Sequence, residues 1–150
     1  MENGEGFNPN RIAVEHKPNL NLENTPRINV IESISKNNGY EAQIIATKGI
    51  FNKRVGSALL NSFDIDSGGN IGSAHLNIVE TVEKYRGKGI GKAVVEAAID
   101  HARKRGIKSI ELDSVDEAVG FYKKLGFKET EDGDGKMKMD LSSELNNQAL

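Results

Sequence analysis

The stretch that most limits how this chain can fold is glycine-rich and reads Tyr-Arg-Gly-Lys-Gly-Ile-Gly-Lys over residues 85–92. An aliphatic, strand-like run over 74–79 precedes it, and a run with helical periodicity over 93–105 follows it. Glycine lets the backbone approach an anion closely, and the first N–H groups of a helix have no partner inside the helix. Because the helix dipole adds partial positive charge there, the order strand, glycine turn, helix predicts a phosphate-binding site.

Three cations, Arg86, Lys88 and Lys92, accompany these glycines, but two familiar phosphate-binding motifs do not fit. A Walker loop has a hydroxyl residue after Gly-Lys, where this chain has Ala93. A dinucleotide-binding loop has a third glycine at the position of Lys92. The pattern that remains is Arg-x-x-Gly-x-Gly, beginning at Arg86. The alternative is an ordinary turn with solvated cations, which three glycines at two-residue spacing disfavour.

Alternating apolar residues upstream predict antiparallel strands. Three runs carry this pattern, the dipeptide Asn38-Gly39 supplies a hairpin turn between the first two, and a turn over 66–70 follows the third. The residues expected on one face of each run are Ile28, Val30 and Ile34, then Tyr40, Ala42, Ile44 and Ala46, then Val55, Leu59, Phe63 and Ile65. A meander of antiparallel strands is therefore expected before the glycine stretch.

Downstream of the glycine stretch the period becomes helical. One stripe is formed by Ile90, Val94, Ala97, Ala98, His101 and Ala102, and Gly106 ends this helix. A short strand over 107–112 follows, so strand, helix and strand predict a right-handed crossover between parallel strands. The segment 114–117 reads as a capping box for a second helix, whose stripe is Ala118, Phe121, Tyr122 and Leu125. A hairpin over 127–141 completes an α+β fold with two main helices in the C-terminal half.

Composition excludes several classes of function. The chain has 150 residues, enough for a single domain with its own core. Its 20 basic and 22 acidic residues give a net charge of −2, which offers no electrostatic case for nucleic acid as the main partner. The absence of cysteine excludes disulfides and a cysteinyl acyl-enzyme. The three histidines have no metal-ligand spacing, so no metal is expected.

The chain is expected to comprise three parts. Residues 1–27 hold all three prolines and no sustained apolar period, which predicts an extended or flexible arm. The structured domain is expected over 28–141, followed by a flexible tail over 142–150. Without an apolar run of membrane-spanning length or a leader-like start, we expect a soluble, cytoplasmic protein with no membrane partner.

Two motifs resemble signatures of one family, the GNAT superfamily of acyl-CoA-dependent N-acyltransferases. Arg-x-x-Gly-x-Gly at Arg86 resembles its pyrophosphate-binding signature. The segment 118–127 is similar to its second signature, a helix ending in Tyr-x-x-x-Gly-Phe before a closing strand. Both occur in the family's order, and the resemblance spans 55–141. It implies a central mixed, mostly antiparallel sheet in which two parallel strands splay apart.

The resemblance also implies acetyl-CoA as the acyl donor. Its pantetheine arm would lie between the splayed strands, here 76–82 and 108–113, with hydrogen bonds near Thr81 and Val82. Its pyrophosphate would lie on the backbone N–H groups of the glycine stretch. The implied cofactor-binding residues of that stretch are Arg86, Gly87, Lys88, Gly89, Ile90, Gly91 and Lys92.

Acetyl transfer to an amine needs a base for the amine and an acid for the departing thiolate. Tyr122 is the candidate acid, since a phenol with a pKa near ~10 is protonated at neutral pH. On residue type alone a packed core tyrosine is the better interpretation, and the family motif reverses that balance. Glu80 is the candidate base, where the family has a backbone irregularity that aims an N–H group at the thioester. A solvated edge carboxylate is its alternative, and Glu83, His75 or water are further candidate bases.

The chain also departs from the family pattern. The family usually places two helices between its first and second strands, where they form one wall of the acceptor site. Here 37–39 leaves no room for them, so either the arm replaces them or the acceptor side is open. Glu83 replaces a common proline, and Val115 stands where an asparagine is frequent. These departures leave the phosphate site intact and weaken inferences about the acceptor.

The sequence therefore predicts an acetyl-CoA-dependent N-acetyltransferase that acts by direct transfer on a primary amine. The acceptor, a small molecule or a protein, is left open, as is the choice between monomer and homodimer. The main alternative is a catalytically silent GNAT-fold module that binds acyl-CoA or a protein partner. A nucleic-acid binder with a basic loop ranks last, because a charged helix terminus explains the basic run over 101–108.

Overall fold

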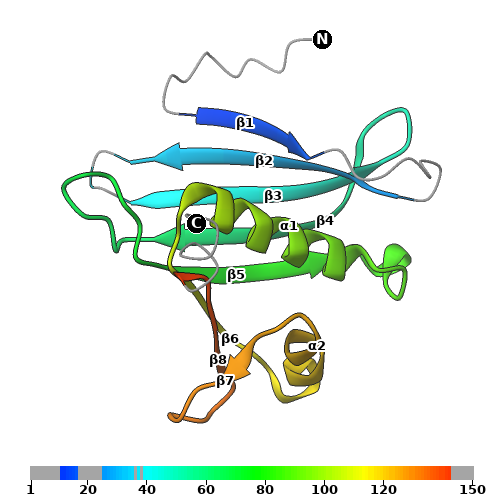
Figure 1. Cartoon of the computed structure of the whole chain (residues 1–150). Helices are drawn as coiled ribbons and strands as arrows, with labels where there is room; N and C mark the ends of the chain where they lie inside the picture. Colours follow the sequence, from blue (N-terminus) through cyan, green and yellow to red (C-terminus); the bar gives the residue numbers. More distant parts are fainter. Residues whose placement is uncertain (1–10, 17–24, 36, 38, 143–150) are drawn as a thin grey trace, which may run out of the picture.

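A computed structural model describes residues 11–16, 25–35, 37 and 39–142, the first of these segments by its backbone alone. Its centre is one eight-stranded sheet with the strand order β1-β2-β3-β4-β5-β6-β8-β7, and helix α1 lies along one face (Figure 1). The strands are β1 (Arg11–His16), β2 (Arg27–Ile34), β3 (Tyr40–Lys48), β4 (Lys53–Ser62), β5 (Ser73–Thr81), β6 (Ser109–Asp113), β7 (Lys128–Glu129) and β8 (Lys136–Asp140). The α-helices are α1 (Ile90–Arg105) and α2 (Val119–Lys124), and the short 3-10 helices are η1 (Glu83–Tyr85) and η2 (Asp116–Ala118).

All neighbouring strands in this sheet are antiparallel except β5 and β6, which run parallel on either side of α1 in the chain. The predicted mixed, mostly antiparallel sheet with two helices in the C-terminal half is confirmed. Between β2 and β3 the chain turns directly: Ser35 N donates to Gly39 O at 2.8 Å, and Gly39 N donates to Ser35 Oγ at 3.0 Å. The predicted turn residue Asn38 lies outside the described residues.

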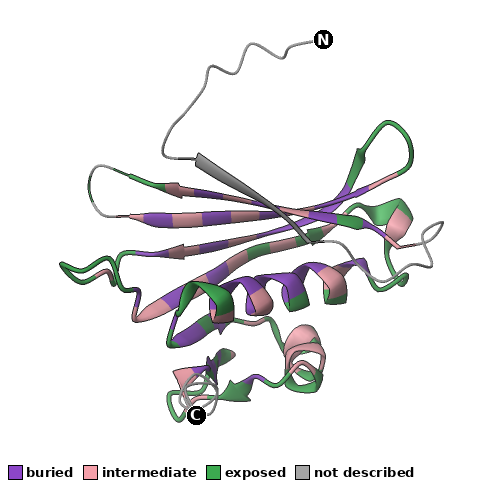
Figure 2. Ribbon diagram, turned by 45° about the horizontal axis from the view of Figure 1, so that its top comes forward, coloured by how far each residue is buried: buried purple, intermediate pink, exposed green. Residues whose placement is uncertain are grey.

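The core lies between α1 and the sheet. Alternate residues of β2 and β3 are buried beneath the helix, and Figure 2 shows buried and half-buried residues alternating along these strands. The buried residues of α1 are Ile90, Val94, Val95, Ala97, Ala98, Ile99, His101 and Ala102. Ile90 contacts the sheet so closely that a Cβ on Gly56 would lie 2.5 Å from its Cγ2 atom. The missing side chain of Gly56 thus lets α1 pack closely against β4, and Ile90 of the predicted apolar stripe fills this space.

The opposite face of β2, β3 and β4 is half-buried. Among the described residues, α1 is the helix packed against these three strands, and it covers the other face. The side chains on the face that α1 leaves uncovered include Asn29, Ile31, Gln43, Ile45, Leu59 and Asn61.

The prediction that Val55, Leu59 and Phe63 lie on the same face of β4 is wrong. Val55 is an extra residue in β4, because the register with β3 shifts between Ala46 and Thr47. Such a bulge reverses the alternation of side chains. Leu60 is consequently in the core, whereas Leu59 faces the open side. Phe63 lies beyond the end of the strand and is 78% exposed.

The predicted capping box at 114–117 is also wrong. Val115 is the N-cap of η2 without a side-chain capping bond, and the Ser114 hydroxyl donates instead to Val115 O at 2.8 Å. Ser114 N donates to Gly135 O at 2.8 Å, so Ser114 still belongs to the end of the sheet. Helix α2 therefore begins only at Val119, and Gly126, with φ +105°, follows its C-cap.

The division into arm, domain and tail stays a prediction. Most of the arm over 1–27 and the tail beyond 142 lie outside the described residues. Within the arm, Arg11–His16 form β1, which pairs with β2 and extends the sheet by one edge strand.

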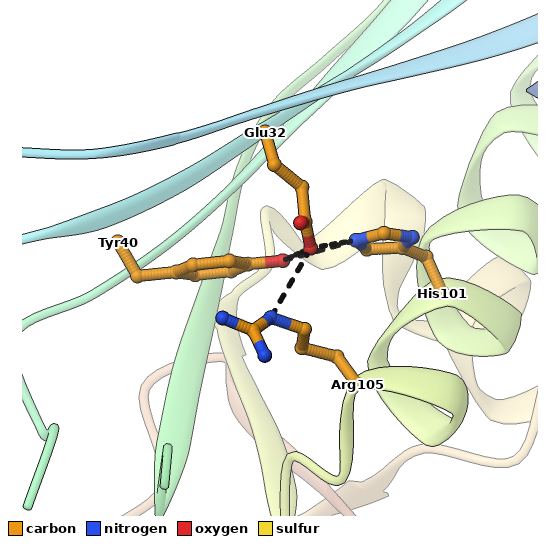
Figure 3. Close-up of polar contacts among 4 residues, drawn as sticks. All are labelled: Glu32, Tyr40, His101 and Arg105. Atoms are coloured by element: carbon orange, nitrogen blue, oxygen red, sulfur yellow. Dashed lines mark hydrogen bonds and ion pairs between the residues drawn. The ribbon is translucent and has the colours of Figure 1, made fainter. Parts of the chain in front are cut away.

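A buried polar cluster joins the C-terminal half of α1 to β2 and β3 (Figure 3). The Tyr40 hydroxyl donates to Glu32 Oε1 at 2.8 Å. His101 Nε2 lies 2.5 Å from the same oxygen and 3.0 Å from the Tyr40 hydroxyl oxygen. Arg105 Nε adds an ion pair to Glu32 at 3.4 Å, and its guanidinium lies over the Tyr40 ring. A buried carboxylate with several partners is fully compensated, so the cluster fixes this part of α1.

The cluster predicts a loss of stability at alkaline pH. Burial, and then the Glu32 carboxylate, raise the pKa of Tyr40 well above its ordinary value. A raised pKa means that the folded state favours the protonated phenol. The contribution of Tyr40 to the free energy of unfolding is therefore fully present below about pH 10 and is lost as the pH rises further. At pH 11 the loss from this residue is about 1.4 kcal/mol in the free energy of unfolding.

Urea unfolding at pH 8 and pH 11 measures this loss. We expect the free energy of unfolding of the wild type to fall further between these values than that of Tyr40→Phe, which cannot ionise at this position. Equal losses in the two proteins would contradict the assignment.

Candidate functional site

The parallel strands β5 and β6 pair over only part of their length. Their register partners run from Ser73 opposite Ser109 to His75 opposite Glu111, although β5 continues to Thr81. On its other side β5 stays paired with β4 up to Thr81, which lies opposite Gly56. The two parallel strands therefore separate after His75, and the β6-facing side of β5 has no strand partner there in the described part of the chain. This is the predicted splay.

A second irregularity lies in the same part of β5. The register with β4 shifts between Ser57 and Leu59, so that β5 holds one extra residue. Ile78, within this bulge, has φ +48° and is 61% exposed. Positive φ is a strained conformation for a β-branched residue, and such strain concentrates at functional sites. The bulge turns the local backbone away from the regular ladder immediately before Glu80.

The glycine stretch forms the predicted turn at the start of α1. Gly87 and Gly89 have φ +75° and +79°, which only glycine adopts without strain. Gly89 is the N-cap of α1 and receives no side-chain capping bond. The first hydrogen bond of the helix runs from Ala93 N to Gly89 O at 3.0 Å. The N–H groups of 90–92 therefore point out of the helix start, and none of the described side chains caps them.

Cations gather around Tyr85, which ends η1 just before this helix start. Lys48, Lys84 and Lys88 place their Nζ atoms 5.9, 5.9 and 5.7 Å from the centroid of the Tyr85 ring. Arg86 Nε donates to Thr81 O at 3.4 Å, which holds the loop against the end of β5. The positive helix end, the free N–H groups and these cations together suit an anion such as a diphosphate.

Glu80 lines a hollow of about 690 Å³ at the end of β5. It shares this hollow with Thr81, Val82 and Arg86 from the predicted cofactor site, and also with Arg54 and Ser57 of β4. The backbone groups of Val82 are both engaged, since its N–H donates to Val55 O and its carbonyl accepts from Tyr85 N. Val82 thus contributes its 43% exposed side chain. Sequence reasoning missed Arg54 and Ser57, because their position depends on strand register.

Tyr122 lies on α2, on the other side of the splay from Glu80. Its ring packs edge-on against Phe121 and Phe127, with centroids 5.0 and 5.7 Å away. Phe121 in turn lies 3.8 Å from where a Cβ of Gly91 would be, so α2 reaches the helix start. Burial raises the pKa of Tyr122 above its ordinary value, so the phenol is protonated at neutral pH with a wide margin. Tyr122 is not among the residues that line the Glu80 hollow.

The other candidate bases lie elsewhere. His75 Nε2 is 3.3 Å from Asp113 Oδ2 and lines a separate hollow with Glu111 and Lys136. It precedes Glu80 by five residues of β5, or roughly 16 Å along a strand. Glu83 begins η1 and is exposed, outside the Glu80 hollow. His75 and Glu83 therefore do not share the hollow that Glu80 lines.

Comparison with known proteins reveals one matching family model. Residues 23–127 match the model of the acetyltransferase (GNAT) family. None of the helices in the described residues has the length and apolar character needed to cross a membrane.

Two curated relatives match over part of their length. The chain is 34% identical over 87 residues to a glucosamine 6-phosphate N-acetyltransferase of Trypanosoma brucei brucei, covering 58% of this chain and 57% of that protein. It is 45% identical over 58 residues to an uncharacterised N-acetyltransferase of Methanocaldococcus jannaschii, covering 37% of this chain and 26% of that protein. The chain thus spans less than two thirds of the length of these relatives.

Solved structures share the fold. A Trypanosoma brucei acetyltransferase superposes with a TM-score of 0.52 and 30% identity, over 61% of this chain and 64% of that one. A GNAT-family N-acetyltransferase of Escherichia coli in complex with CoA has a TM-score of 0.55 and 17% identity, over 71% and 62% of the two chains. These likenesses support the overall fold.

The geometry around Gly91 yields a prediction that separates ligand binding from folding. A Cβ at this position would lie 3.6 Å from Thr81 Oγ1 and 3.8 Å from Phe121 Cζ, which are ordinary contacts. Gly91→Ala should therefore fold normally and, through helix propensity, gain up to about 1 kcal/mol. The added methyl group would stand beside the free N–H groups, so we expect the Kd for CoA to rise at least about tenfold, or ~1.4 kcal/mol.

Calorimetric titration with CoA measures this change, and Gly120→Ala in α2 is the matched control. A Cβ there meets nothing within 4 Å, so this variant should bind CoA as the wild type does. Undiminished CoA binding by Gly91→Ala would show that the phosphates lie elsewhere.

Proposed function

Since this chain belongs to the GNAT family of acetyltransferases, we propose that it moves an acetyl group from acetyl-CoA directly to a primary amine. The observation that supports this proposal most strongly is the uncapped start of α1 beside the splay of β5 and β6. An anionic diphosphate and an extended thioester arm need these two features side by side. The donor's diphosphate would accept hydrogen bonds from the N–H groups of 90–92.

The bulge in β5 would position the reacting carbonyl. Near Ile78 the extra residue releases backbone groups from the ladder with β4, and a freed N–H group could donate to the thioester oxygen. Glu80, two residues further on, would remove a proton from the acceptor ammonium, directly or through water. The neutral amine could then attack the carbonyl carbon.

Tyr122 would complete the reaction as general acid. As the new C–N bond forms and the C–S bond breaks, the acceptor nitrogen loses its second proton to water, and the departing CoA thiolate takes a proton from Tyr122, which regains one from solvent. The phenol of Tyr122 is protonated at neutral pH, and burial raises its pKa further. Its place on α2, which reaches the start of α1 through Phe121, supports this role. No acyl-enzyme is needed, and the chain has no cysteine to form one with a thiol.

A catalytically silent module that binds acyl-CoA is the alternative. An acetyltransferase and a silent module would both bind acetyl-CoA, but only the acetyltransferase would release CoA when an amine is added. Thiol release with a panel of primary amines distinguishes them. Glucosamine 6-phosphate is one amine for that panel, because a relative carries its name.

The acid role of Tyr122 predicts a selective loss of turnover. Tyr122→Phe should lower kcat by roughly 100-fold or more, the usual effect of losing a general acid. Its Kd for acetyl-CoA should change little, because the ring still packs against Phe121 and Phe127. Steady-state thiol release and calorimetry measure the two quantities.

Tyr40→Phe is the control, since Tyr40 is buried in the polar cluster on β2, β3 and α1. This variant should retain the wild-type kcat. Unchanged turnover in Tyr122→Phe would remove Tyr122 from the mechanism, without affecting the assignment of the CoA site.

A further inference from the structure

The open face of the sheet carries a second hollow beside the one that contains Glu80. Its volume is about 210 Å³. Its lining includes Glu41, Gln43, Ile45, Arg54, Leu59 and Ile78. Arg54 and Ser57 line both hollows, so the two spaces adjoin at these residues. A compound whose amine reaches Glu80 could therefore extend its other end past Arg54.

Arg54 is exposed, and a hydrogen bond orients its guanidinium at this junction. Its Nη2 atom donates to Ser57 Oγ at 2.6 Å, and Ser57 is buried, directly opposite Glu80 in the register of β4 and β5. No carboxylate among the described residues forms an ion pair with Arg54. A guanidinium has five N–H donors in a rigid fork, so most of them remain available. A cation oriented by such a hydrogen bond loses less entropy when it binds an anion than a cation without one.

Each hollow contains a carboxylate, Glu80 in the first and Glu41 in the second, and Arg54 is the cation that they share. Glu80 supplies a carboxylate for an ammonium group, and Arg54 of the neighbouring strand supplies a cation that lines the same hollow. The second hollow adds an apolar floor of Ile45, Leu59 and Ile78. At its rim Gln43 Nε2 donates to Glu41 Oε1 at 3.1 Å, and the free groups of this pair can bind hydroxyl groups. A small, polar compound with charges of both signs matches this arrangement.

We propose that the acceptor carries an anionic group, a phosphate or a carboxylate, in addition to its amine, and that Arg54 binds this group. The proposal rests on the acetyl transfer proposed above and names the class of its acceptor. Arg54 is then the residue that determines specificity, because a guanidinium binds phosphate and carboxylate oxygens in a bidentate manner. Neutral amines and simple polyamines lack this interaction, and a polyamine would also bring a second cation towards Arg54.

Matched pairs of amines test this proposal without any mutation. The pairs are phosphoethanolamine with ethanolamine, glucosamine 6-phosphate with glucosamine, and γ-aminobutyrate with butylamine. The first two pairs probe a phosphate, and the third probes a carboxylate. We expect kcat/KM for thiol release from acetyl-CoA to be at least about tenfold higher for the anionic member of one or more pairs, the usual effect of one charged hydrogen-bonded contact.

Arg54→Gln should remove this preference by raising KM for the anionic member alone. Its Kd for acetyl-CoA should not change. Lys53→Gln is the matched control: it removes the same charge from the neighbouring exposed residue, which lines neither hollow. We expect Lys53→Gln to keep the full preference for the anionic amine.

The possible outcomes separate the two proposals. Turnover with neutral and anionic amines at equal kcat/KM would overturn the anionic acceptor and leave the acetyl transfer intact. A preference that survives Arg54→Gln, or that Lys53→Gln abolishes equally, would overturn the role of Arg54. If no amine in any pair released CoA, both proposals would be wrong.

Discussion

The free N–H groups at the start of α1 are the feature on which the proposed site depends. They are free because Gly87 and Gly89, both at positive φ, bring the chain into the helix without a capping side chain. The helix cannot shift to cover them. Close contact between Ile90 and Gly56 fixes its first turn, and the bonds of His101 and Arg105 to Glu32 fix its last turns. A rigid helix fixed towards both ends presents these donors in a constant direction, which is the condition for tight anion binding.

Strand β5 gives the rest of the site its shape. On one side it departs from β6 after His75, which leaves an open edge for an extended ligand. On the other side its bulge at Ile78 changes the register with β4, so that Glu80 lies opposite Ser57. Arg54 donates a hydrogen bond to that serine, and its guanidinium lines the same hollow as the Glu80 carboxylate. One irregular strand therefore connects the donor side of the site with the acceptor side.

The sequence predicted those features that depend on local pattern. Glycine spacing and a 3.6-residue period can be recognised within one segment of the sequence, and they predict the glycine turn, α1 and the parallel pair of β5 and β6. The bulges at Val55 and Ile78 could not be predicted from the sequence, because a bulge is a shift in register with the neighbouring strand. The phase error in β4 and the omission of Arg54 both follow from this. The bonds of His101 to Glu32 and Tyr40 join residues more than 60 positions apart, so its burial was predictable and its partners were not.

The most direct test of the central claim is an amide NMR titration that compares CoA with pantetheine, which lacks the diphosphate. The account predicts that CoA shifts the backbone N–H signals of Ile90, Gly91 and Lys92 strongly, because these groups donate to the diphosphate. Pantetheine should leave these three signals almost unchanged at concentrations that shift signals of β5. If CoA bound without moving them, or if pantetheine moved them equally, the start of α1 would not be the diphosphate site.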